Sequence, residues 1–406
     1  AHCMYNGSIM ALRRCQGFTR YALSLQYHGQ YHLGVSYQGL QKENCIITSN
    51  SKNETDLRGL QSIEGRLIEA FHNLAGPENV ENVKISSRTD RGVHALRNTC
   101  HVDVRKRNLS DSIEGGSQCW DPIRIIHGLN YHLCRQSLFF PLHYQSRQKI
   151  PPKRYDLRII SAAKAPPFME NKFYHLSPSE QQQVLQHQQE QPRHIDWNAR
   201  FSATKRTYVY RMIHLPVATE EYNIPFEHDR AWILDRKSTG GGQMNIKAMQ
   251  EAASYMVGNG IDYSSFRGKS CQRSSPVVNV LSADVSCTPY YGNYTDFAAA
   301  NMMTMINDDF SQHNKKITSS ENESSSVTTG TQPIPASLIT FTISGDSFVY
   351  RQVRNMVGCL VEIGKGKLQP THVKDLLEKR QRKLAPAMAP AHGLFLVDVE
   401  HGDFSF

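Results

Sequence analysis

The sequence lacks the features that mark several large classes of protein. No apolar run approaches the roughly 18 residues that a membrane-spanning helix needs. The nine cysteines are odd in number, and no two of them have Cys-x-x-Cys spacing. No glycine-rich phosphate loop and no His/Cys/carboxylate cluster with metal-ligand spacing is present. We therefore expect reduced thiols in an intracellular compartment, no membrane partner and no cofactor.

An excess of positive charge is present instead. The 406 residues include 46 Lys and Arg against 37 Asp and Glu, which gives a formal net charge of +9. Such a balance favours a polyanionic partner, nucleic acid before a membrane surface. The chain is long enough for two domains, and its mean hydropathy of −0.50 indicates folded parts interrupted by polar inserts.

The first residues allow two interpretations. The sequence starts at Ala1, so we expect the N-terminus to be incomplete. Residues 1–20 contain no acidic residue and three arginines, which is typical of the end of an organelle transit peptide. An ordinary ragged N-terminus is the alternative. The compartment therefore stays open between cytoplasm, nucleus, chloroplast and mitochondrion.

One loop carries the strongest chemical signal. Residues 87–95 lie between two predicted strands, 82–85 and 98–104, and contain a single carboxylate, Asp90. Arg88 and Arg91 bracket it, and nearby cations favour the ionised form of a carboxylate. Gly92 allows a backbone conformation that a Cβ would forbid. A solvated ion pair in a surface turn is the alternative for a short Arg-x-Asp-x-Gly pattern.

The longer string Arg-Thr-Asp-Arg-Gly-Val-His-Ala, residues 88–95, resembles the catalytic loop of tRNA pseudouridine synthases of the TruA type. The resemblance implies that Asp90 is the catalytic carboxylate. His94 is interpreted as structural.

Two further stretches are similar to motifs of the same family. Arg200-Phe-Ser-Ala is followed by Tyr208-Val-Tyr, and Arg354 lies in Val-Arg-Asn-Met-Val-Gly. The resemblance implies that Tyr208 lies in the active site and that Arg354 points into it and pairs with Asp90. On sequence pattern alone, Tyr208 would be a core aromatic and Arg354 a surface arginine at the edge of an apolar helix face.

The resemblance also implies a fold class. We expect an α+β protein with two similar α/β halves, mixed or antiparallel sheets and a basic cleft between the halves. The halves would be residues 21–200 and 201–406. Polar inserts are expected near residues 41–57, 105–121, 134–154, 164–195 and 286–336.

The resemblance implies a reaction that turns uridine into pseudouridine in tRNA. The expected target is the anticodon stem-loop, at positions 38–40. Asp90 would act on the base or on the ribose, and Tyr208 would stack on the displaced base or take its C5 proton. A homodimer is compatible with the family. RNA contacts are expected from Arg88, Arg91, Arg200, Lys205, Arg206 and Arg267. The alternatives are an inactive RNA-binding protein of the same fold and a synthase acting at other positions or on other RNAs.

Four helices are predicted from periodicity. Ser62 caps a helix that Gly76-Pro77 ends. A second helix carries a stripe of Ile123, Ile126, Leu129 and Leu133. A third is built from Met244, Ala248, Ala252 and Met256, and a fourth covers residues 348–363.

Overall fold

The computed structural model describes residues 18–35, 62–105, 120–135, 155–166, 197–215, 227–290, 336–402 and 404–406. The expectations for residues 1–17 and for most of each polar insert concern residues outside these ranges. The insert expected near 286–336 has its first residues in a strand, which continues to Pro289.

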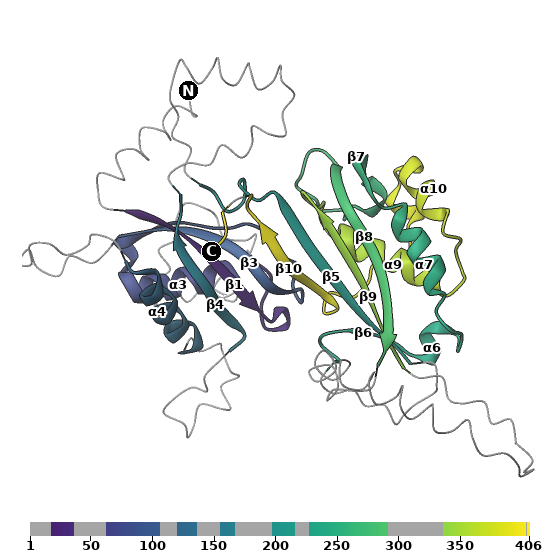
Figure 1. The fold of residues 1–406 in the computed structure, drawn as a ribbon, viewed down its shortest axis with the longest axis horizontal. Helices are drawn as coiled ribbons and strands as arrows, with labels where there is room; N and C mark the ends of the chain where they lie inside the picture. Colours follow the sequence, from purple (N-terminus) through teal and green to yellow (C-terminus); the bar gives the residue numbers. More distant parts are fainter. Residues whose placement is uncertain are drawn as a thin grey trace, which may run out of the picture.

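The described residues form an α+β fold, as predicted, but their strands make one continuous mixed sheet instead of a separate sheet in each half (Figure 1). The strand order is β4-β1-β3-β10-β5-β9-β8-β7, with β2 paired to β3 and β6 paired to β5. The β10–β3 and β5–β6 pairs are parallel and the other pairs antiparallel. The strands are β1 (Thr19–Tyr27), β2 (Val80–Ile85), β3 (His94–Val104), β4 (Leu157–Lys164), β5 (Lys205–His214), β6 (Trp232–Leu234), β7 (Gly258–Asp262), β8 (Val277–Pro289), β9 (Ser337–Gly345) and β10 (Leu394–Glu400).

Strand β10 joins the two halves of the chain. It comes from the end of the sequence, yet it lies between β3 of the first half and β5 of the second half (Figure 1). Leu396 is opposite Ala95 of β3 on one side and Tyr208 of β5 on the other. The loop that precedes β3 and the middle of β5 are therefore brought to the same part of the sheet.

The helices pack on the two ends of this sheet, α3 and α4 with the first half and α7, α9 and α10 with the second (Figure 1). Helix α3 begins and ends as predicted, because Ser62 Oγ accepts a hydrogen bond from Gly65 N and Gly76 follows the last residue with φ 92°. The helices are α3 (Ile63–Ala75), α4 (Pro122–Arg135), α6 (Arg236–Thr239), α7 (Ile246–Ser254), α9 (Gln352–Gly364) and α10 (His372–Lys379). Short 3-10 turns are η1 (Gly29–Tyr31), η2 (Pro77–Asn79), η5 (Ser264–Phe266) and η6 (Arg382–Leu384).

The apolar face predicted for α4 is partly wrong. Ile125, Leu129 and Leu133 are buried, whereas Ile123 is 61% exposed. Buried positions follow an i, i+4, i+8 row, which is one stripe of the helix surface. Asn130 lies beside this stripe and exchanges two hydrogen bonds with the backbone of Ile159 in β4.

Helix α9 starts later than predicted. Residues 348–351 do not belong to it, because Arg351 adopts a left-handed conformation with φ 63° and the helix begins at Gln352. Gln352 Oε1 accepts a hydrogen bond from Val349 N at 2.8 Å, which closes the turn before the helix. Among the described helices, none combines the length and the apolar character required to cross a membrane.

Candidate active site

The carboxylate of Asp90 lies in a tight loop between β2 and β3. Val93 N donates to Asp90 O at 3.1 Å, and Gly92 takes a φ of 85°, which glycine adopts without a steric penalty. Gly29 packs against this loop so closely that a Cβ on it would lie 2.1 Å from Val93 O. The loop is thus held rigidly, and the Asp90 side chain stays 18% exposed.

The partner of this carboxylate comes from the other half of the chain. Arg354 Nη1 donates to Asp90 Oδ2 at 2.8 Å, although 264 residues separate the two. Arg354 Nε donates to Ala389 O at 2.9 Å, so its guanidinium is fixed between helix α9 and the segment before β10. The Arg354 side chain is only 10% exposed. The structure therefore brings Asp90 and Arg354 together and places Arg354 on the buried side of the carboxylate.

A second cation, which the sequence did not single out, faces the same oxygen. Arg351 Nε lies 3.8 Å from Asp90 Oδ2, and the Arg351 side chain is 41% exposed. Arg351 lies three residues before Arg354. Both fall within the helix predicted over residues 348–363, and that prediction does not distinguish Arg351 from the other residues of the helix. Its left-handed backbone could not be read from the sequence.

Among the described residues, the two arginines that flank Asp90 in the loop make no ion pair with it. The described ion pairs of Asp90 are to Arg351 and Arg354. Arg88 is exposed and turns to Gln272, with Nη1 3.3 Å from the amide oxygen. Arg91 is exposed as well.

Tyr208 lies on β5 beside this pair. Its ring is buried and meets Phe348 edge to face, with 5.3 Å between ring centroids. Burial raises the pKa of Tyr208 to about 12, with Asp90 also raising it and Arg206 lowering it. The phenol is therefore neutral at neutral pH.

A set of buried hydrogen bonds holds the start of the loop. Asn98 Nδ2 donates to Ser87 O at 2.8 Å and to Tyr27 Oη at 3.0 Å, and Tyr27 Oη lies 2.9 Å from Thr89 Oγ1. Burial raises the pKa of Tyr27 well above its usual range. Sequence reasoning missed Tyr27 and Asn98, and the only signal for Asn98 was an amide within a predicted strand.

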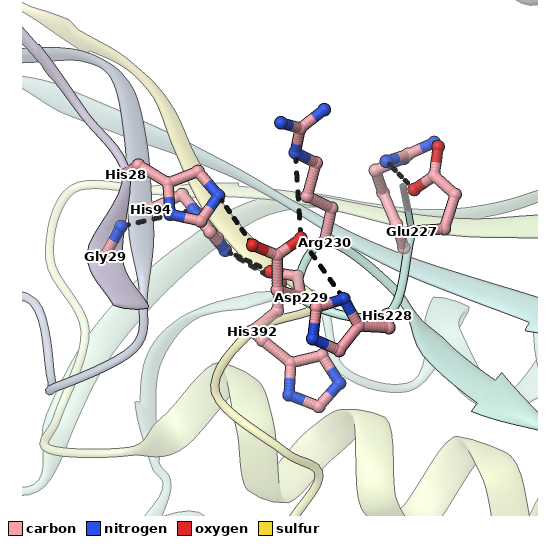
Figure 2. A network of polar contacts seen from close by, with 9 residues as sticks. His28, Gly29, His94, Glu227, His228, Asp229, Arg230 and His392 are labelled. Atoms are coloured by element: carbon pink, nitrogen blue, oxygen red, sulfur yellow. Dashed lines mark hydrogen bonds and ion pairs between the residues drawn. The ribbon is translucent and has the colours of Figure 1, made fainter. Parts of the chain in front are cut away.

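His94 fixes the end of the loop. Its Nδ1 accepts from Gly29 N at 3.2 Å, and its Nε2 donates to the carbonyl oxygens of Asp229 at 2.9 Å and His392 at 3.0 Å (Figure 2). Burial lowers the pKa of His94 to about 4, with His28 adding to the effect, so the ring is neutral. Both ring nitrogens have backbone partners, which is the structural role predicted for this residue.

The basic residues predicted to contact RNA divide into two groups. Arg200 is exposed, and Lys205 is partly exposed with its ammonium 2.9 Å from Glu400 Oε1. The guanidinium groups of Arg206 and Arg267 instead donate mainly to backbone carbonyls. Arg206 donates to Ala203 O, Arg200 O and Asp346 O. Arg267 donates to Cys271 O and Arg273 O.

Arg206 also donates to Ser87 Oγ at 3.2 Å and thereby ties β5 to the start of the Asp90 loop. Within the described part of the chain, no three His, Cys, Asp or Glu side chains gather where a metal ion could bind.

Known proteins resemble this chain over most of its length. A family model described as tRNA pseudouridine synthase matches residues 252–401. A human protein named tRNA pseudouridine synthase-like 1 is 26% identical over 360 residues, which cover 86% of this chain and 87% of the human protein. tRNA pseudouridine synthase A of Jannaschia sp. (strain CCS1) is 25% identical over 389 residues, covering 95% and 97% of the two chains.

The tRNA pseudouridine synthase A of Anaplasma phagocytophilum (strain HZ) is 32% identical over 206 residues, 51% of this chain and 60% of that protein. The family model matches residues 252–401, within the second half of the chain, while the human and Jannaschia relatives cover 86% and 95% of it and so include the Asp90 loop. Together they confirm the resemblance to tRNA pseudouridine synthases of the TruA type, which extends over most of the chain.

Proposed function

We propose that this chain converts uridine to pseudouridine in tRNA and that Asp90 is its catalytic carboxylate. The observation that carries the proposal is the Asp90–Arg354 pair, in which a partly exposed carboxylate is aimed by a nearly buried guanidinium from the other half of the chain. Similarity to tRNA pseudouridine synthases supports the class of reaction, an isomerisation.

The reaction breaks the N1–C1′ glycosidic bond and forms a C5–C1′ bond. C5 loses its proton and N1 gains one, so atoms and electrons balance without a co-reactant. A single carboxylate that acts on the base or on the ribose is sufficient. A uridine within a helical stem must first leave the base stack, because Asp90 cannot reach it there.

Tyr208 is proposed to stack on the displaced base. Stacking on an aromatic ring is worth roughly 1–3 kcal/mol and needs only the ring, so Tyr208→Phe should keep its tRNA affinity. Because its phenol is neutral, the hydroxyl can accept the C5 proton only after it has released its own. If the hydroxyl serves in this way, Tyr208→Phe lowers turnover by about 10²–10⁴. Near-wild-type turnover would leave stacking alone, and Tyr208→Leu should lose both functions.

The exposed arginines Arg88, Arg91 and Arg200 and the partly exposed Lys205 are proposed to contact tRNA phosphates. The excess positive charge of the chain supports this assignment. Arg206 and Arg267 are proposed to shape the RNA-binding surface by holding its loops, since their donors are occupied by backbone carbonyls. The target is proposed to be the anticodon stem-loop at positions 38–40, which rests on the family alone.

The experiment is a tritium-release assay on an unmodified tRNA transcript that carries [5-³H]uridine. Because the ring is rejoined through C5, one tritium enters water for each pseudouridine formed, and the purified chain should release it in the presence of EDTA. Pseudouridine mapping then shows which positions react. Tight tRNA binding without release would favour the alternative, an inactive RNA-binding protein, and mapping outside 38–40 would correct the target.

We propose an intracellular site of action, and the free thiols of Cys100, Cys134, Cys271, Cys287 and Cys359 support it.

A homodimer is a prediction that rests on the resemblance to the family, and light scattering on the purified chain would test it.

A further inference from the structure

Arg351 occupies a position where local structure disfavours an arginine. Its φ of 63° lies in the left-handed region that glycine and asparagine adopt most readily. It is the N-cap residue of α9 but makes no side-chain capping bond, and helix N-caps favour Ser, Thr, Asp or Asn. Neither the backbone nor the helix start therefore benefits from this side chain.

The Arg351 guanidinium has unused binding capacity. It lies 4.7 Å from the centroid of the Tyr350 ring and 3.8 Å from Asp90 Oδ2, which is too far for a hydrogen bond. Among the described residues it has no hydrogen-bond partner, so its five N–H donors are available to a ligand. Arg354, on the same oxygen, is fixed by Ala389 O.

Two cations on one carboxylate leave the local charge positive. Arg354 already neutralises Asp90 and aims it, so Arg351 adds a second positive charge at the open side of the site. An RNA nucleotide that places its ribose and base against Asp90 carries a phosphate on the same ribose. A planar guanidinium matches a phosphate with two parallel hydrogen bonds, which a carboxylate at 3.8 Å does not provide.

We propose that Arg351 binds a backbone phosphate of the target nucleotide, and that it turns from Asp90 to this phosphate when RNA enters. This inference rests on the proposed function of the site. Arg351 is then a substrate-binding residue, whose departure opens Asp90 to the reacting nucleotide while Arg354 keeps the carboxylate in place.

The chain contains a matched control. Arg380 is the only other arginine of the described residues with a positive φ, 54°, and it lies 3.6 Å from another carboxylate, that of Asp262. Glycine suits the left-handed backbone at both positions, so Arg351→Gly and Arg380→Gly should both fold, with melting temperatures within a few degrees of the wild type.

The test compares both variants and Arg351→Lys on an unmodified tRNA transcript with uridines at positions 38–40. Arg351→Gly should raise KM about tenfold and leave kcat within about threefold, as expected when a contact to bound substrate is removed. It should also lower the slope of log(kcat/KM) against log salt by about 1. Arg351→Lys should recover most of the slope and part of the KM, and Arg380→Gly should match the wild type.

Three results would overturn the assignment: an unchanged KM and salt slope in Arg351→Gly, a loss confined to kcat, or an equal loss in Arg380→Gly. The salt slope of tRNA binding by fluorescence anisotropy gives the same comparison without catalysis. A wild-type chain without tritium release would therefore contradict the proposed function, while the binding slopes would still decide the role of Arg351.

Discussion

Two Arg–Asp pairs with the same N–O distance of 2.8 Å differ in what surrounds them. Arg66 and Asp156 are 1% and 7% exposed, His32 Nε2 lies 3.2 Å from the same carboxylate oxygen, and Arg66 also donates to Leu133 O. Arg354 and Asp90 are 10% and 18% exposed. We call the first the closed pair, because it is buried between α3, α4 and the start of β4. The second is the open pair, because the protein covers it only on the side of Arg354. This difference in enclosure is the reason why we assign a structural role to the first pair and propose a catalytic role for the second.

The largest expected effect on stability is at the closed pair. Asp156→Asn leaves Arg66 charged in a dry environment, and breaking a buried pair in this way costs about 3–5 kcal/mol of unfolding free energy. Urea unfolding measures the change. Turnover per folded molecule should change far less than in Arg354→Ala, since the described ion pairs of Asp90 involve neither residue of this pair. A loss below about 1 kcal/mol would show that water reaches Asp156 as it reaches Asp90.

At the open pair the larger effect should be on turnover. Arg354→Ala removes the donor that aims Asp90, and we expect turnover to fall about 10²–10³-fold. Unfolding free energy should fall less than in Asp156→Asn, because Asp90 is partly hydrated. Arg354→Lys should recover part of the activity, since an ammonium cannot make both contacts of the guanidinium.

A double-mutant cycle of Asp90→Asn with Arg354→Ala checks this pairing. The double variant should be more stable than the sum of the single variants by about 0.5–3 kcal/mol. Additive changes, together with an active Arg354→Ala, would end the account of Arg354 as the partner of Asp90.

Acid should weaken the fold through buried histidines. Burial lowers the pKa of His32 at the closed pair and lowers the pKa of His94 at the site to about 4. The unfolded chain then binds protons that the folded chain does not, so stability is full above pH about 6.5 and declines as pH falls. For His94 alone the loss by pH 4 is about 3 kcal/mol. Urea unfolding from pH 7 to 4 measures it, and a flat profile would contradict the neutral state of these rings.

The smallest effect should be at an exposed pair. Lys205 and Glu400 are 36% and 46% exposed, so Lys205→Gln should change unfolding free energy by less than about 1 kcal/mol. Affinity for tRNA should fall about twofold to fivefold if Lys205 contacts a phosphate. An unchanged affinity would place Lys205 outside the RNA-binding surface.

Local chemistry made parts of the fold predictable. Ser62 and Gly76 mark the ends of α3 because the capping bond needs a side-chain acceptor and the positive φ of the C-cap favours glycine. The position of β10 between β3 and β5 depends on contacts between the two ends of the chain, which no local pattern contains.

Site residues that belong to a family motif could be predicted from the sequence. Site residues whose position depends on tertiary contacts could not. The resemblance directed attention to Asp90, Tyr208 and Arg354, which the structure brings to one place. Arg88 and Arg91 flank Asp90 in sequence, yet the loop turns Arg88 to Gln272. The role proposed for Arg351 depends on a left-handed φ that delays the start of α9.

The most direct measurement is tritium release by Asp90→Asn beside its tRNA affinity. The change replaces one oxygen by nitrogen, so the loop and its neighbours are retained while the charge is lost. We expect product formation to fall at least about 10⁴-fold, the loss of a covalent or proton-transfer catalyst. The dissociation constant for tRNA should stay within a few-fold of the wild type. Substantial activity in Asp90→Asn, or an equal loss of binding and activity, would contradict Asp90 as the catalytic carboxylate.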